Sequence, residues 1–229
     1  MPSNNSEYEL YVSVISANPR LFLDNLGHLE SLGIDGIHFD VMDGSFVPRL
    51  GLYPEFLKEI RSISSLPIEV HMMMENPESF IEDFVEVGAT SIIPHVESLT
   101  QVSRVISKIK DSGAQAGVAL NPGTHLGLLE EIVSRLDTVV LMAINPGIVG
   151  HVFIDETFNK AIRLSRLLTK LNENPTIEID GGVNFTNAKR IIASGEGRRV
   201  RLVCGAGTIF HRDGSMKQNM TRLVESLSD

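Results

Sequence analysis

The feature that most constrains the fold is an alternation that recurs eight times along the chain. A short apolar run, rich in Val and Ile, is followed by a loop and then by an amphipathic stretch. Runs that are apolar on both faces are typical of strands buried in a parallel sheet. The alternation therefore predicts eight strands connected by helices. The runs begin near Leu10, Gly36, Pro67, Ser91, Gln115, Thr138, Thr176 and Arg199.

The amphipathic stretches carry helical periodicity. In one of them, five apolar residues form a stripe, which predicts an α-helix whose stripe faces the sheet. The stripe comprises Leu128, Leu129, Ile132, Val133 and Leu136.

Eight strand–helix units favour a closed barrel over an open, doubly wound sheet. The open sheet would place a glycine fingerprint after the first strand, where this chain reads Ser-Ala-Asn-Pro. We therefore predict an α/β fold: a single (β/α)8 TIM-barrel domain over residues 1–229, with residues 1–9 as a flexible N-terminal tail.

Composition excludes several classes of partner. The chain has 20 basic and 29 acidic residues, a net charge of −9, and so lacks the basic surface that nucleic acid or an anionic membrane requires. Its single cysteine, Cys204, permits no intrachain disulfide and lies in an apolar run, so we expect an inert core thiol. The N-terminus has no signal-peptide pattern, and no apolar run approaches the roughly 20 residues of a membrane span. We expect a cytoplasmic protein with neither nucleic-acid nor membrane partners.

Active sites of such barrels lie at the carboxyl ends of the strands, and four polar residues at those ends form a candidate metal site. His38 and Asp40 are two residues apart, so they share one face of the second strand. His71 ends the third strand and Asp180 the seventh. Two imidazoles and two carboxylates suit Zn²⁺, Fe²⁺ or Mn²⁺, whereas the competing interpretation is four separate hydrogen-bonded core or rim residues.

The two carboxylates also suit proton transfer. Asp40 and Asp180 come from distant strands and could face a substrate from opposite sides. Acid/base groups on the two faces of one carbon, beside a Lewis acid, permit deprotonation on one face and reprotonation on the other. The alternative is that one or both only hold the metal.

Glycines follow the seventh and eighth strands, where such barrels usually bind phosphate through backbone N–H groups. They lie at Gly181, Gly182, Gly205 and Gly207, with Ala206 between the last two. The alternative is two tight turns. All seven lysines lie in or beside helical stretches, which argues against a Schiff-base aldolase.

These residues give the chain a family resemblance. It resembles the ribulose-phosphate 3-epimerase family over approximately Leu10 to Phe210, with the motifs in the family's order. The motifs are S-V-I-S-A-N, H-F-D-V-M-D-G-S-F-V-P, E-V-H-M-M-M-E-N-P, A-L-N-P-G-T, A-I-N-P-G and E-I-D-G-G-V-N. The resemblance implies a (β/α)8 barrel, a homo-oligomer and metal-dependent epimerisation at C3 of a ketose phosphate.

The resemblance also implies roles for individual residues. His38, Asp40, His71 and Asp180 would bind one divalent ion (Zn, Fe(II), Mn or Co), and Asp40 and Asp180 would be the acid/base pair. The substrate-binding set would be Ser13, Met42, Met73, Met142, Gly147 and Gly150. The phosphate-binding set would be Gly181, Gly182, Gly205, Ala206 and Gly207.

The chain departs from the family pattern at three loops. Arg49 replaces an asparagine, residues 148–151 read Ile-Val-Gly-His rather than F-G-G-Q, and Gly205–Gly207 lacks a serine hydroxyl. These changes either alter the substrate or are neutral drift.

The predicted activity is conversion of D-ribulose 5-phosphate to D-xylulose 5-phosphate by two-base transfer through a metal-stabilised enediolate. The alternatives are a 3-epimerase of a hexulose 6-phosphate such as D-allulose 6-phosphate, a sugar-phosphate lyase, and a non-catalytic sugar-phosphate-binding barrel. His95 ends the fourth strand and either supports the site from behind its ligands or is a hydrogen-bonded rim residue, and we favour the rim. We expect Arg198, Arg199 and Arg201 to be solvated or interface residues at the opposite end of the barrel.

Overall fold

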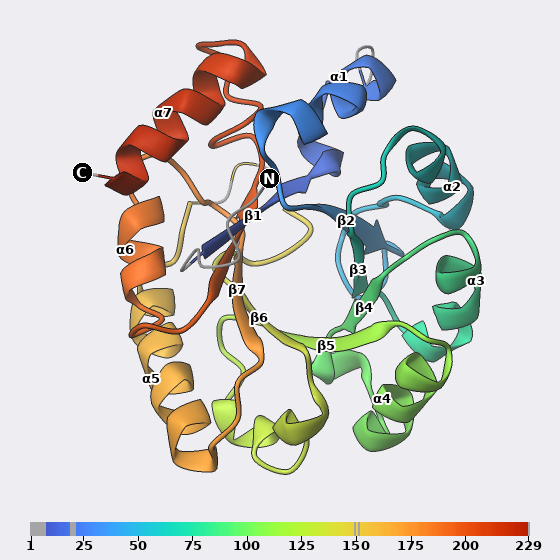
Figure 1. Cartoon of the computed structure of the whole chain (residues 1–229). Helices are drawn as coiled ribbons and strands as arrows, with labels where there is room; N and C mark the ends of the chain where they lie inside the picture. The colour runs from blue at the N-terminus through green and yellow to red at the C-terminus, as the bar shows by residue number, and fades with distance from the viewer. Residues whose placement is uncertain (1–7, 19–21, 149, 151, 229) are drawn as a thin grey trace.

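The chain folds around a closed barrel of eight parallel strands, each paired with its neighbours in sequence order (Figure 1). The computed structural model describes residues 8–18, 22–148, 150 and 152–228. The strands are β1 (Tyr8–Ser13), β2 (Gly36–Met42), β3 (Ile68–Met73), β4 (Ser91–Pro94), β5 (Gln115–Leu120), β6 (Thr138–Met142), β7 (Thr176–Asp180) and β8 (Val200–Cys204). The predicted barrel is thus confirmed, and every strand begins within two residues of the expected position.

Helices surround the barrel (Figure 1). The α-helices are α1 (Phe22–Leu29), α2 (Pro54–Ile63), α3 (Ile81–Glu86), α4 (Val102–Asp111), α5 (Glu156–Leu171), α6 (Ala188–Ala193) and α7 (Met216–Ser228). The 3₁₀ helices are η1 (Val14–Ser16), η3 (Glu30–Leu32), η4 (Pro77–Ser79), η5 (Val96–Ser98), η6 (Leu126–Leu129) and η7 (Val133–Arg135). Across the described part of the chain, no helix is long and apolar enough to cross a membrane.

The prediction of an α-helix after the fifth strand is wrong. That connection contains the two short 3₁₀ helices η6 and η7 instead. The buried pairs Leu126/Leu129 and Val133/Leu136 are each three residues apart, which matches the three residues per turn of a 3₁₀ helix. Leu128, expected in the buried stripe, is 57% exposed.

The N-terminal boundary also differs from the expectation. Tyr8 and Glu9, which we placed in a flexible tail, belong to β1 and pair with Val200 and Arg201 of β8. Their pairing closes the barrel at its amino-terminal end. Residues 1–7 lie outside the described range.

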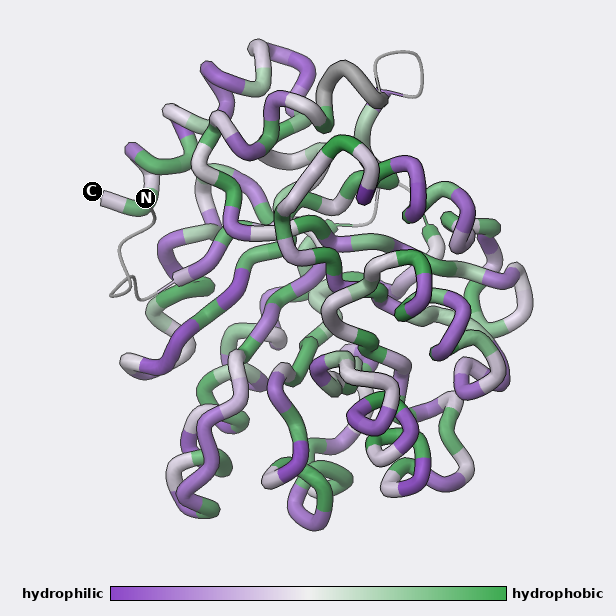
Figure 2. The backbone as a smooth tube through the Cα atoms, turned by 45° about the vertical axis from the view of Figure 1, so that its right-hand side comes forward, coloured by the Kyte–Doolittle hydropathy of each residue, from purple (hydrophilic) through white to green (hydrophobic). Residues whose placement is uncertain are grey.

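Buried apolar side chains form two separate clusters. The larger core lies between the strands and the helices. The outer helices in Figure 2 carry both hydrophobic and hydrophilic residues, as expected of helices with one buried face. A small second cluster, Ile93, Ala119, Val140 and Met142, comes from β4, β5 and β6. Alternate residues of a strand point to opposite faces, so this cluster fills one side of the barrel interior. The other side is left for polar residues of β1–β3, β7 and β8.

Strand register sets the height of those polar residues. Asp40 of β2 is level with His71 of β3, and Met142 of β6 is level with Asp180 of β7. One layer below, His38 is level with Glu69, and Glu178 with Arg201. The interior therefore has a polar layer near the carboxyl ends of the strands and a charged layer beneath it.

Candidate active site

The four predicted metal ligands come together inside the barrel. His38 Nε2 lies 3.4 Å from Asp40 Oδ1 and 3.7 Å from Asp180 Oδ2. His71 Nδ1 lies 3.6 Å and 3.4 Å from the same two oxygens, and the two imidazole nitrogens are 3.1 Å apart. All four residues are buried. One ligand atom from each thus faces a common centre.

The spacing of these atoms fits a metal ion. Bonds of about 2.0–2.2 Å in a tetrahedral site place neighbouring ligand atoms roughly 3.3–3.6 Å apart. The observed separations run from 3.1 to 3.7 Å, and all the donors lie within 4.8 Å of one another. Nitrogen and carboxylate donors in this combination suit zinc, iron(II), manganese or cobalt. The residues therefore fit a divalent cation.

The charges around the two imidazoles favour a cation at this centre. Burial opposes a charged imidazole, but the carboxylates of Asp40 and Asp180 outweigh it and raise the pKa of His38 well above its usual value. The same two carboxylates raise the pKa of His71. A site that draws protons onto buried histidines carries excess negative potential, which a divalent cation would neutralise.

Each histidine also has a hydrogen-bonding partner behind it, a common arrangement for metal-binding imidazoles. His38 Nδ1 lies 2.7 Å from Glu69 Oε1, so a proton on Nδ1 leaves the Nε2 lone pair facing the centre. His71 Nε2 instead contacts His95 Nε2 at 2.9 Å, and His95 Nδ1 lies 3.1 Å from Glu97 Oε2.

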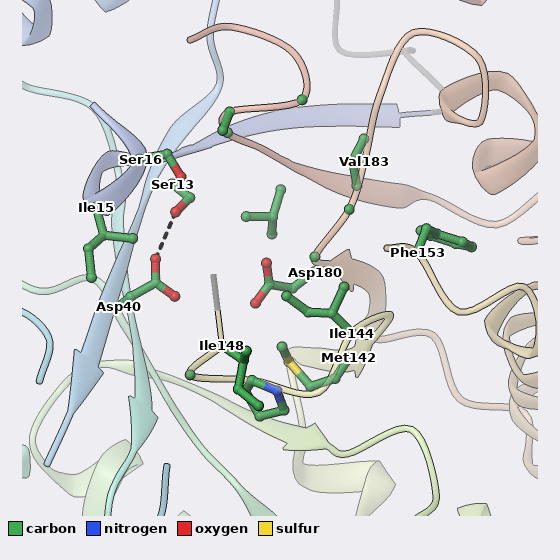
Figure 3. A pocket seen from close by; sticks show the side chains of 18 of the residues that line it. Ser13, Ile15, Ser16, Asp40, Met142, Ile144, Ile148, Phe153, Asp180 and Val183 are labelled. Carbon is green, nitrogen blue, oxygen red and sulfur yellow. Dashed lines mark hydrogen bonds between the residues drawn. The ribbon is translucent and has the colours of Figure 1, made fainter. Parts of the chain in front are cut away.

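Asp40 is fixed by a hydrogen bond from the end of β1. Ser13 Oγ donates to Asp40 Oδ2 over 2.8 Å, leaving Oδ1 to face the imidazoles (Figure 3). Burial alone would raise the pKa of Asp40, but His38 and His71 lower it far below the ordinary range. Asp40 is therefore an ionised carboxylate.

A pocket of about 410 Å³ opens directly above this cluster. Asp40 and Asp180 point into it from opposite sides (Figure 3), whereas His38 and His71 lie beneath it, fully buried. It contains every residue of the predicted substrate and phosphate sets. These are Ser13, Met42, Met73, Met142, Gly147, Gly150, Gly181, Gly182, Gly205, Ala206 and Gly207. The volume suits a small metabolite.

One end of the pocket is lined by the loops after β7 and β8. Gly181 and Gly182 have φ of +100° and +68°, conformations that side-chain-bearing residues rarely adopt. Such a turn directs backbone N–H groups outward, as a phosphate cradle requires. Gly205–Gly207 faces the same pocket.

The altered loops border the pocket as well. Arg49 and Ile148 line it, so two of the departures from the family pattern border the pocket. Val149 and His151 lie outside the described residues.

Sequence reasoning missed a charged layer beneath the ligands. Arg201 of β8, expected to be solvated, is buried, and its Nη1 lies 2.5 Å from Glu69 and 3.2 Å from Glu178. Burial and the charge of Glu69 raise the pKa of Glu178 to about 7. The sequence does indicate the position of these carboxylates. Glu69 and Glu178 each precede a predicted metal ligand by two residues, so they lie on the same face of the strand as that ligand. Arg199, by contrast, is 54% exposed at its side chain, as expected.

His95 also differs from the expectation. It is fully buried rather than at the rim, between His71 and Glu97. Burial raises the pKa of Glu97, but hydrogen bonds from His95, Thr124 and the Asn121 N–H outweigh it and lower that pKa to about 2. Cys204 is a buried free thiol, as expected. Asp43 orients its loop by accepting hydrogen bonds from the backbone of Ser45, Phe46 and Glu75.

Comparison of the fold with solved structures supports the barrel alone. A mutant tryptophan synthase alpha-subunit from Pyrococcus furiosus matches with a TM-score of 0.66 at 15% identity, over 96% of this chain and 97% of that one. KGPDC from Streptococcus mutans matches with a TM-score of 0.68 at 10% identity, over the same shares.

Sequence comparison is more specific. The ribulose-phosphate 3 epimerase family model matches residues 9–207. The ribulose-phosphate 3-epimerase of Aquifex aeolicus is 39% identical over 195 residues, 85% of each chain. The chloroplastic ribulose-5-phosphate-3-epimerase of Arabidopsis thaliana is 37% identical, over 88% of this chain and 71% of the relative, and the Escherichia coli K12 enzyme is 34% identical over 82% and 84%. The chain therefore belongs to the ribulose-phosphate 3-epimerase family and is an isomerase of the epimerase class.

Proposed function

We propose that the protein epimerises C3 of a ketose phosphate, with D-ribulose 5-phosphate and D-xylulose 5-phosphate as the interconverted pair. The observation that carries this proposal is the placement of Asp40 and Asp180 on opposite sides of one pocket above a cluster able to hold a metal. The membership of the family supports the reaction class.

The reaction needs one carboxylate and one carboxylic acid. The C3 proton of a ketose is acidic because C2 is a carbonyl carbon. One aspartate, ionised, removes that proton and an enediolate forms. The other, protonated, returns a proton to the opposite face of C3. The configuration is inverted, no atoms are gained or lost, and the two aspartates exchange protonation states.

The cluster beneath the pocket would hold a divalent cation through His38, His71 and one oxygen each of Asp40 and Asp180. Such a cation supplies Lewis-acid stabilisation of negative charge on the substrate oxygens. Ser13 holds Asp40 by its Oδ2 atom, which keeps the carboxylate at the edge of the pocket.

The sugar phosphate would lie with its phosphate at the glycines after β7 and β8. Gly181, Gly182 and the segment Gly205–Gly207 line that end of the pocket. Backbone N–H groups bind an anion without added positive charge, which suits a protein of net charge −9. Met42, Met73 and Met142 would give the reacting carbon a polarisable apolar wall.

Isotope exchange in deuterated water tests the two-base proposal. Asp40→Asn and Asp180→Asn should each abolish deuterium incorporation at C3, since an amide neither takes nor gives the proton. Asp83→Asn, at an exposed position of α3, is the matched control and should exchange at the wild-type rate. Circular dichroism checks that each variant folds. Full turnover by either site variant would refute the mechanism.

A hexulose 6-phosphate is the second candidate substrate, and Arg49 is the observation that favours it. This side chain lines the pocket and makes no ion pair with any residue in the described ranges. A free guanidinium beside the site could bind the additional hydroxyl of a longer sugar. Comparing pentulose and hexulose phosphates in the exchange assay decides between the two substrates.

A further inference from the structure

A line of hydrogen bonds runs from His71 away from the pocket. His71 Nε2 meets His95 Nε2 at 2.9 Å, and His95 Nδ1 meets Glu97 Oε2 at 3.1 Å. Both imidazoles are fully buried. The two rings lie within 18° of parallel with centroids 5.0 Å apart, and the Phe46 ring packs on His95 at 4.9 Å. His95 is therefore held in one orientation between His71 and Glu97.

The far end of this line is anchored by the loop after β5. Glu97 Oε1 accepts hydrogen bonds from the Asn121 N–H, at 2.8 Å, and from Thr124 Oγ1. Lys160 Nζ of α5 donates to the carbonyl oxygens of Asn121 and Pro122, at 2.6 and 3.1 Å, and so fixes that loop. The two Glu97 oxygens therefore have different partners: Oε1 faces the loop and Oε2 faces His95.

The direction of each bond follows from its partners. The Glu97 carboxylate only accepts, so His95 Nδ1 carries a proton. A neutral His95 then has its lone pair on Nε2, and His71 must donate from Nε2. The proton on Nε2 leaves the lone pair of His71 on Nδ1, the atom that faces Asp40 and Asp180.

We infer that His95 and Glu97 are positioning residues, which hold His71 in the tautomer that presents its Nδ1 lone pair to a divalent cation. The inference rests on the metal site of the proposed function and extends it. His38 is supported by Glu69 directly, whereas His71 is supported by Glu97 through the ring of His95. The two imidazole ligands are thus held by different carboxylates.

Glu97→Gln should exchange donor and acceptor in each hydrogen bond of this line, while the side chain keeps nearly the same shape. The Asn121 N–H requires an acceptor, so the amide oxygen faces the loop and the amide NH₂ faces His95. His95 Nδ1 must then accept, its proton moves to Nε2, and His71 Nε2 accepts in turn. The proton of His71 is displaced to Nδ1, where it blocks the metal. We expect divalent metal affinity to fall about 10–100-fold, as for other partners behind metal-binding histidines.

Two measurements test this, and neither depends on epimerase activity. The first is the dissociation constant for Zn²⁺ and for Co²⁺, by chelator competition, in the wild type, Glu97→Gln and the exposed control Glu130→Gln. The second is the long-range ¹H–¹⁵N spectrum of the metal-free protein, which reports which ring nitrogen of His71 and His95 is protonated. The spectrum of the wild type needs no variant, so it tests the inference even if Glu97→Gln fails to fold.

Protonation of His71 at Nε2 in the wild type, together with tighter metal binding by the wild type and Glu130→Gln than by Glu97→Gln, would support the inference. Protonation of His95 at Nε2 rather than Nδ1 in the metal-free wild type, or equal metal affinity in all three proteins, would overturn it. The proposed metal site fails separately, and the inference with it, if the wild type binds neither metal.

Discussion

Arg201→Met should strongly destabilise the protein, because it leaves buried carboxylates without their cation. The Arg201 side chain is 7% exposed and pairs with Glu69 at 2.5 Å, Glu178 at 3.2 Å and Glu9 at 2.8 Å. Glu69 and Glu178 are fully buried. Methionine keeps an unbranched apolar side chain, so the loss comes mainly from the guanidinium, which pairs with these carboxylates and lies 3.9 Å above the Tyr11 ring. Breaking a buried ion pair costs about 3–5 kcal/mol, and we expect that loss in the free energy of unfolding at neutral pH.

The loss in the free energy of unfolding should become smaller as the pH falls. In the wild type, burial raises the pKa of Glu69, but Arg201 and His38 outweigh it and hold the pKa below its usual value. This carboxylate therefore contributes stability above its unfolded pKa, and the contribution is lost as pH falls through the lower folded pKa. Without Arg201, burial raises the pKa of Glu69, and the cost of its buried charge disappears as it is protonated. The difference between variant and wild type should shrink from about pH 8 to about pH 5.

Urea unfolding followed by circular dichroism measures both effects. Arg166→Met is the matched control, because Arg166 pairs with Glu196 at 2.7 Å on the surface, where its side chain is 69% exposed. That variant should lose far less stability, because exposed ion pairs contribute little. A loss of similar size in the two variants, or a loss at Arg201 that grows as pH falls, would refute the reasoning.

Three further predictions concern the core, the substrate and the metal. Burial raises the pKa of the Cys204 thiol to about 12, so this cysteine should react with a thiol reagent only as fast as the protein unfolds; rapid labelling of the native protein would contradict its burial. Arg49→Asn should raise KM for the preferred ketose phosphate by about tenfold or more if the guanidinium binds substrate, since a hydrogen bond to a charged group contributes about 1.5–3 kcal/mol; an unchanged KM for every substrate tested would mean that the loop change is neutral. Metal at about 100 times its Kd stabilises the folded state by about 2.7 kcal/mol, so a chelator should lower Tm by roughly 5–10 °C in calorimetry. Asp40→Asn should show a smaller shift on metal removal, and an equal shift would place the metal elsewhere.

The barrel could be predicted from sequence because most of the eight runs are rich in Val and Ile and mostly apolar on both faces. The starts at Gly36, Ser91, Gln115, Thr138 and Thr176 are reproduced without change. The segment after β5 could not be predicted in the same way. A repeat of apolar residues every three to four positions fits an α-helix and a pair of 3₁₀ turns alike, and local hydrogen bonding decides between them.

The four ligands could be predicted because a period of two places His38 beside Asp40, and the barrel brings the strand ends together. The same period applies to Glu69 and Glu178, but charged residues in strands do not by themselves reveal whether a partner neutralises them. Their partner Arg201 lies on β8, and only the register of β7 with β8 places it level with Glu178. His95 was misplaced because it follows β4 and reads from sequence as the start of a loop.

The most direct test of the proposed activity is proton NMR of the metal-loaded protein with D-ribulose 5-phosphate in deuterated water. We predict formation of D-xylulose 5-phosphate that carries one deuterium, at C3, with further exchange at C3 of both sugars and at no other carbon. A hexulose 6-phosphate that exchanges faster at C3 would change the substrate and leave the chemistry intact. Fragments from carbon–carbon cleavage, or no C3 exchange with any ketose phosphate in the presence of Zn²⁺, Fe²⁺, Mn²⁺ or Co²⁺, would contradict the account.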